Sequence, residues 1–160
     1  MVEYARNPEK TVYDDLKAVL HYAENEEKIV PEQEKTMYVT GVNCAADTAF
    51  QEMKAVQERF GKTTGNVAYH AYQSFKTSEV SPELCHRIGV ELAKKMWGDQ
   101  YQVLVATHFN TGTYHNHFVL NAVNLWNGRK FNLGLKTFGK VIGQCIFSSI
   151  LYSGDILMVV

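Results

Sequence analysis

The chain has 160 residues, of which 46% are hydrophobic and 21% are charged. This length and composition are typical of one soluble globular domain with a core of its own. The formal net charge is −1, which excludes a strongly basic nucleic-acid-binding protein, so any basic surface must be local.

The cysteines are widely spaced and form no CxxC pair, which argues against a disulfide framework and against a thiolate zinc site. They are Cys44, Cys85 and Cys145. We therefore expect reduced thiols and a cytoplasmic location. No apolar signal region follows Met1, and polar residues interrupt the apolar segment 142–160. The sequence thus predicts neither secretion nor a membrane partner.

In chain order, an apolar stripe with helical spacing predicts a first helix over Val12 to Ala23. The polar run 24–35 is expected to be a loop, and residues 37–42 a short strand. A second helix is expected from Asp47 to Phe60, where Gly61 ends it.

Residues 67–75 are rich in aromatic and β-branched residues and predict a strand. Ser81, Pro82 and Glu83 follow, and they predict a helix start with a cap, a proline at the first helical position and an acid for the dipole. Apolar residues at i+4 spacing continue this helix up to Gly98.

The last predicted elements form a hairpin. Residues 102–108 are expected to be a strand, Asn110 to Gly112 a turn, and His115 to Trp126 a second strand. Asn127-Gly128 is typical of a tight turn, after which 129–131 would return as a further strand. Mixed helices and hairpins favour an α+β fold with a largely antiparallel sheet.

The hairpin carries three histidines, and these are the candidate metal ligands: His108, His115 and His117. Strand side chains alternate, so His115 and His117 point to the same face. His108 ends the neighbouring strand, so its ring can converge with theirs. Three neutral imidazoles leave positions open for water or substrate, as catalysis requires. The alternative is two histidines at a hairpin rim and a third by chance.

Imidazole ligands do not select one metal. On affinity, zinc, manganese, nickel or iron suit nitrogen ligands better than magnesium does. An ion that contacts phosphate could nevertheless be magnesium or manganese in the cell, so the expected cofactor is a divalent ion, Mg or Mn, with Zn an alternative.

The block from Ala106 to Val123, which contains the three histidines, resembles the histidine motif of the relaxase/mobilization nuclease family, a branch of the HUH endonuclease superfamily. Three earlier stretches resemble the same family in the same order: 38–44, 68–75 together with Glu79, and 88–93. The resemblance covers roughly residues 2–131, and the histidine block is its most specific part.

This resemblance implies an antiparallel sheet flanked by helices, with the histidines on central strands. It also implies that a tyrosine attacks one phosphodiester of single-stranded DNA at a transfer origin, as in plasmid mobilization and conjugation. The enzyme becomes linked to the 5′ phosphate and leaves a 3′ hydroxyl. Accessory relaxosome proteins and a coupling protein are the implied partners.

The family places the nucleophile on its first helix, before a segment like residues 7–11. Tyr4 fits this context best, and Tyr22, in a partial echo of the same segment, is the alternative. The family usually has an aspartate two residues after the first metal-binding histidine, where this chain has Asn110. An asparagine accepts a hydrogen bond but carries no charge, so we expect reduced activity.

The ends of the chain also depart from the family pattern. We expect a partial relaxase/mobilization nuclease domain over residues 1–131, followed by an atypical tail over 132–160, with the fold truncated at both ends. The tail has few charged residues where the family has a charged helix.

Several other features suggest weaker interpretations. Gly61-Lys62-Thr63 looks like the end of a phosphate-binding loop, but it follows a helix rather than a strand, so we reject that function. His70 is expected in the core or facing DNA rather than as a ligand, and His86 is expected to be solvated. The aromatic residues of the 67–75 strand could stack on bases, but core packing is the favoured explanation.

Three functions remain open at this point: a DNA-nicking relaxase, an unrelated three-histidine hydrolase or oxygenase, and a non-catalytic relaxase remnant that binds single-stranded DNA. Only the first requires a tyrosine that becomes covalently attached to DNA.

Overall fold

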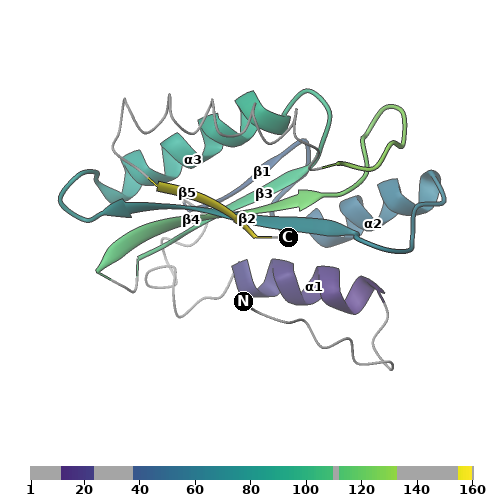
Figure 1. Ribbon diagram of the computed structural model, residues 1–160, viewed down its shortest axis with the longest axis horizontal. Helices are drawn as coiled ribbons and strands as arrows, with labels where there is room; N and C mark the ends of the chain where they lie inside the picture. Colours follow the sequence, from purple (N-terminus) through teal and green to yellow (C-terminus); the bar gives the residue numbers. More distant parts are fainter. Residues whose placement is uncertain (1–11, 24–37, 110–111, 133–154, 160) are drawn as a thin grey trace.

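The structure is a computed structural model that describes residues 12–23, 38–109, 112–132 and 155–159. These residues form three helices and one sheet (Figure 1). The helices are α1 (Val12–Ala23), α2 (Ala49–Arg59) and α3 (Pro82–Trp97). The strands are β1 (Val39–Val42), β2 (Ala68–Lys76), β3 (Val103–His108), β4 (Thr113–Asn121) and β5 (Asp155–Val159).

The sheet has five strands in the order β1-β3-β4-β2-β5, and every pairing is antiparallel. Helix α3 covers one face, whereas α1 and α2 lie on the other (Figure 1). The α+β prediction with an antiparallel sheet is therefore confirmed. The inner position of β3 and β4 also matches the expectation that the histidines lie on central strands.

Apolar clusters on both faces of the sheet hold the layers together. On one face, Leu16 and Leu20 of α1 and Met53 of α2 pack on sheet residues that include Val119. On the other face, α3 packs on the sheet through a second cluster that includes Trp97. Successive side chains of a strand point to opposite faces of the sheet. Each side chain of β3 and β4 therefore faces either α3 or the layer of α1 and α2.

The expected helices and four of the expected strands are present, with ends displaced by a few residues. The return strand expected at 129–131 is wrong: this segment makes only an isolated bridge between Val123 and Lys130. Asn124 explains the difference, since its side-chain oxygen accepts hydrogen bonds from the backbone N–H groups of Trp126 and Asn127. These local bonds turn the chain where a strand would need extended backbone.

The start of α3 follows the sequence prediction. The Ser81 hydroxyl accepts a hydrogen bond from the backbone N–H of Leu84, at 3.2 Å, and Pro82 occupies the first helical position. Replacing Ser81 with alanine should therefore destabilise the fold by about 1 kcal/mol. We expect the melting temperature to fall by about 3 °C in thermal unfolding followed by circular dichroism. An unchanged melting temperature would contradict this role for the cap.

Candidate active site on the histidine face of the sheet

The β3–β4 hairpin brings the three predicted ligands to one face of the sheet. His108 is paired with His115, and Ala106 is paired with His117. Paired residues on adjacent strands point to the same side, as do residues two apart on one strand. All three imidazoles therefore project from the face that α1 and α2 cover, which we call the histidine face.

The residue between two of the histidines fixes this orientation. Asn116 is fully buried on the opposite face. Its side-chain oxygen accepts a hydrogen bond from the Thr107 hydroxyl at 2.6 Å, and its amide donates to the carbonyl of Cys85 at 2.8 Å. Gly89 lets α3 approach this closely, because a Cβ there would lie 2.6 Å from the Asn116 side chain. These contacts fix the Asn116 side chain on the α3 side of β4. The side chains of His115 and His117, on either side of it, therefore point to the histidine face.

The ring of His117 lies at the centre of the group. Its centroid is 4.1 Å from that of His108 and 6.4 Å from that of His115. The His115 ring is directed to Thr113, with 2.6 Å between Nε2 and Oγ1. Within the residues that the structure describes, no three His, Cys, Asp or Glu side chains already stand as a coordination group. His108 and His117 are thus adjacent, whereas His115 would have to turn to complete a metal site.

A fourth imidazole joins this group, and it was not expected there. His70 of β2 lies with its Nε2 3.0 Å from Nδ1 of His117. Alternation along β2 puts His70 on the same face as Tyr72, which is the partner of His117 in the register. The sequence shows this alternation, but it does not show that β2 pairs with β4 in this register, so the proximity was missed.

The carboxyl end of α1 meets the histidines directly. The imidazole of His108 is 98% buried, and its Nε2 donates a hydrogen bond to the backbone carbonyl of Ala23 at 2.6 Å. Tyr22 immediately precedes Ala23 in the last turn of α1. The other two predicted catalytic residues, Tyr4 and Asn110, lie outside the described residues.

Burial keeps two of the four imidazoles neutral. Desolvation lowers the pKa of His70, and the nearby His108 lowers it further. Desolvation also lowers the pKa of His115. A neutral imidazole has a lone pair to offer a metal ion, whereas a protonated one has none. The electrostatics of this face therefore suit metal ligation at neutral pH.

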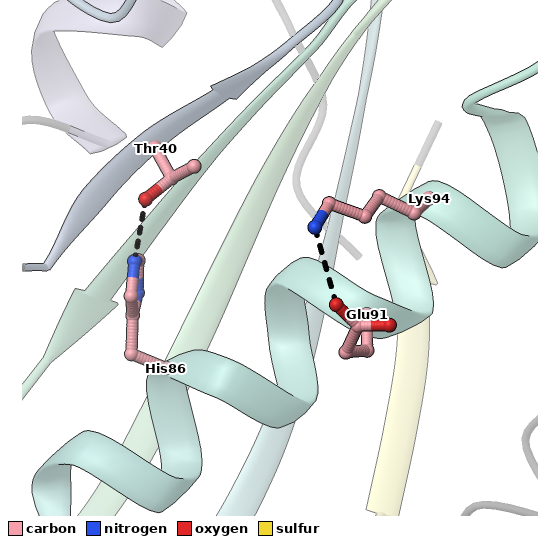
Figure 2. Close-up of polar contacts among 4 residues, drawn as sticks. All are labelled: Thr40, His86, Glu91 and Lys94. Atoms are coloured by element: carbon pink, nitrogen blue, oxygen red, sulfur yellow. Dashed lines mark hydrogen bonds and ion pairs between the residues drawn. The ribbon is translucent and has the colours of Figure 1, made fainter.

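His86 is not solvated, which corrects the sequence-based expectation. It is 92% buried and lies between two hydroxyl groups. Its Nε2 is 2.8 Å from Oγ1 of Thr40 (Figure 2), and its Nδ1 is 2.7 Å from Oγ1 of Thr107. The apolar stripe of α3 did not reveal this, because β1 and β3 supply the polar partners. By contrast, Glu91 and Lys94 on the same helix form an exposed ion pair (Figure 2).

The burial of His86 predicts a pH dependence of stability. Desolvation lowers its pKa from 6.5 to about 4. Between these values the unfolded chain binds a proton that the folded chain does not, so stability falls as the pH drops through this window. The contribution is at most about 3 kcal/mol.

Melting temperatures measured from pH 7 to pH 4 should therefore decline less steeply in His86→Gln than in the wild type. Parallel profiles for the two proteins would show that His86 does not contribute. His70 and His115 act in the same direction and remain in both proteins, so the comparison isolates His86.

Two residues of the rejected phosphate-loop motif, Gly61 and Lys62, line an open surface cleft that contains none of the candidate histidine ligands. Gly61 and Lys62 follow the end of α2, opposite the 127–130 turn. There Lys130 donates hydrogen bonds to the backbone carbonyls of Thr64 and Asn66. The cleft therefore lies between two loops that Lys130 links. This structural role explains why carbonyl oxygens hold the lysine.

The aromatic residues of β2 divide between the two faces. Phe75 is fully buried, and Tyr69 donates a hydrogen bond to the carbonyl of Phe131 on the α3 side. Tyr72 lies on the histidine face, with its ring 6.3 Å from that of His117. Core packing thus explains Phe75 and Tyr69, and only Tyr72 borders the candidate site.

Comparison with known proteins decides the family. The sequence pattern of the family described as "Relaxase: MobA/VirD2-like, nuclease domain" matches residues 22–141. The chain belongs to this relaxase family. The resemblance that the histidine block suggested is thereby confirmed, and an unrelated three-histidine hydrolase or oxygenase is excluded. The description of this family is that of a nuclease domain.

Individual relaxases resemble parts of the chain. "Protein rlx" of Staphylococcus aureus is 45% identical over 93 residues, which is 58% of this chain and 28% of that protein. "Group II intron-interrupted relaxase LtrB" of Lactococcus lactis is 28% identical over 157 residues, covering 81% of this chain and 28% of that relaxase. This chain therefore spans under a third of the length of these relatives. No solved structure matches it.

No helix in the described part of the relaxase chain is both long and apolar enough to cross a bilayer.

Proposed function

We propose that this relaxase domain cuts one strand of DNA at a transfer origin through a covalent tyrosine intermediate at the histidine face. One observation carries the proposal: the end of α1 is hydrogen-bonded to His108, within the histidine cluster. A tyrosine on α1 and a group of imidazoles are the two parts that this reaction needs. The contact of the Ala23 carbonyl with His108 supports placing both parts in one site.

The chemistry is a phosphoryl transfer with balanced bonds. The tyrosine oxygen attacks phosphorus, the bond from phosphorus to the 3′ oxygen breaks, and a phosphotyrosine ester to the 5′ end forms. The phenol proton ends on the departing 3′ oxygen, which becomes a hydroxyl. Because an ester replaces an ester, the reverse reaction can rejoin the strand. A phenol has a pKa near ~10, so its attack at neutral pH requires assistance.

The residues proposed to hold a divalent ion are His108, His115 and His117. The donor set fits, since three imidazoles share one face and two of them are already adjacent. When bound, the ion would polarise the phosphate oxygens and offset their developing charge. Because the ion would contact phosphate, Mg²⁺ or Mn²⁺ is the proposed cofactor, with Zn²⁺ the alternative that nitrogen ligands favour.

We propose Tyr22 as the nucleophile, with Tyr4 as the alternative. Two findings support this order. Tyr22 is the chain neighbour of Ala23, whose carbonyl contacts His108. The family match also includes residue 22 and begins after residue 4. This preference reverses the sequence-based ranking, which relied on local context alone.

Asn110 is proposed to act by accepting a hydrogen bond near the cut phosphate, in the place where the family usually has an aspartate. The proposed setting is the cytoplasm, with a plasmid or conjugative element as the source of the DNA. Accessory relaxosome proteins and a coupling protein are the proposed partners. The second candidate function is a non-catalytic remnant that binds single-stranded DNA, and the replacement of aspartate by Asn110 is the observation that favours it.

One experiment distinguishes these functions. Purified protein is mixed with Mn²⁺ and a pool of labelled single-stranded oligonucleotides of random sequence, and the products are separated on a denaturing gel. A labelled band that migrates with the protein and survives denaturation is expected, and sequencing its DNA identifies the preferred site. If DNA binds under native conditions but no such band forms, the remnant function replaces the relaxase function.

A further inference from the structure

The ring of His117 has a partner that the proposed reaction has not yet used. Nε2 of His70 and Nδ1 of His117 are 3.0 Å apart, the ring planes lie within 13° of each other, and the centroids are separated by 5.2 Å. A nitrogen–nitrogen distance so much shorter than the centroid separation means that the rings meet edge to edge. The contact is thus an N–H···N hydrogen bond close to both ring planes.

The number of N–H protons on two neutral imidazoles restricts the direction of this hydrogen bond. A neutral imidazole carries one N–H donor and one acceptor nitrogen. If His117 binds an ion through Nε2, its single proton must be on Nδ1. That N–H then donates to Nε2 of His70, which must carry its own proton on Nδ1. Metal binding at His117 and acceptance by His70 are therefore compatible with one set of tautomers.

We propose that His70 is a positioning residue that accepts the Nδ1–H hydrogen bond of His117 and thereby holds its ring and tautomer ready for the divalent ion. This inference rests on the proposed metal site. Ligating histidines usually donate their second N–H to a carboxylate, a carbonyl or water, and loss of that partner weakens metal binding about 10- to 100-fold. The Ala23 carbonyl makes the corresponding contact with His108. His70 takes that place for His117.

The position of His70 in the sheet explains why it can serve this purpose. His70 lies on β2 two residues before Tyr72, which is paired with His117. The rings of His70 and His117 are therefore diagonal neighbours on the same face. The strand is hydrogen-bonded along its whole length to β4. The acceptor is therefore held by a paired strand rather than by a loop.

The first test needs no metal. In the metal-free protein, ¹⁵N-resolved imidazole spectra report which nitrogen of His117 carries the proton. We expect the Nδ1–H tautomer in the wild type and in His70→Gln, whose side-chain oxygen can accept the same bond. In His70→Leu, which fills the space without an acceptor, the Nε2–H tautomer should gain population. An unchanged tautomer balance in His70→Leu would overturn the proposal.

The second test measures the affinity for Mn²⁺ by electron paramagnetic resonance and for Zn²⁺ by calorimetry. His70→Leu should bind about 10- to 100-fold more weakly than the wild type, and His70→Gln should recover most of that loss. Tyr69→Phe, which removes a hydrogen bond from the same strand on the opposite face, should bind normally. Equal losses in His70→Leu and His70→Gln would contradict a role as acceptor.

The two tests separate the inference from the proposed function. If the folded wild-type protein binds neither ion, the three-histidine metal site fails. The tautomer spectra still decide whether His70 orients His117.

Discussion

Replacing Tyr22 with phenylalanine should abolish the covalent adduct between the protein and DNA. Phenylalanine keeps the ring and removes only the oxygen that would attack phosphorus, so the α1 helix and its contact with His108 should persist. Loss of a nucleophile removes the covalent route altogether, and we expect the rate of adduct formation to fall by at least about 10³-fold. Quantification of the labelled band on a denaturing gel measures this.

The matched control is Tyr4→Phe, which makes the same chemical change at the alternative nucleophile. It should form the adduct at a rate close to that of the wild type. The opposite pattern, with loss in Tyr4→Phe and retention in Tyr22→Phe, would move the nucleophile to Tyr4 and leave the metal site untouched. An adduct that survives the double substitution would rule out both tyrosines.

Replacing His117 with alanine should have the second largest effect. Its ring lies next to those of His108, His115 and His70, so its loss removes a proposed ligand and the centre of the cluster together. The effect should exceed the ~100-fold seen when only an orienting partner is lost. We expect no detectable Mn²⁺ binding at micromolar protein, and adduct formation reduced by more than about 100-fold.

His86→Gln is the control, because it removes a buried histidine from the other face of the sheet. It should bind Mn²⁺ as the wild type does, even where its stability is reduced. If His117→Ala and His86→Gln weaken Mn²⁺ binding equally, the loss reflects the fold and not the site.

Local sequence patterns predicted most of the secondary structure because their causes are local. The cap and proline at the start of α3 and the stripe of α1 each depend on residues within a few positions, and both elements lie where they were expected. The return strand at 129–131 was wrong because the side chain of Asn124 competes for backbone N–H groups. A periodic pattern does not reveal such competition.

The candidate site was only half visible in the sequence. The hairpin made it possible to place His108, His115 and His117 on one face, since the turn and alternation fix their relation. His70 and His86 could not be placed, because their partners lie on strands distant in the sequence. Local context favoured Tyr4, and that prediction is still to be tested. The contact that supports Tyr22, between Ala23 and His108, joins residues 85 positions apart and is not visible in local context.

The most direct test of this account is anomalous diffraction from crystals of the protein grown with Mn²⁺. We expect a single anomalous peak on the histidine face, within about 2.3 Å of one ring nitrogen from each of His108, His115 and His117. We also expect His70 to stay hydrogen-bonded to His117 without touching the ion. Rings that point apart around no peak, or a peak elsewhere on the molecule, would contradict a metal-dependent nuclease site on this face.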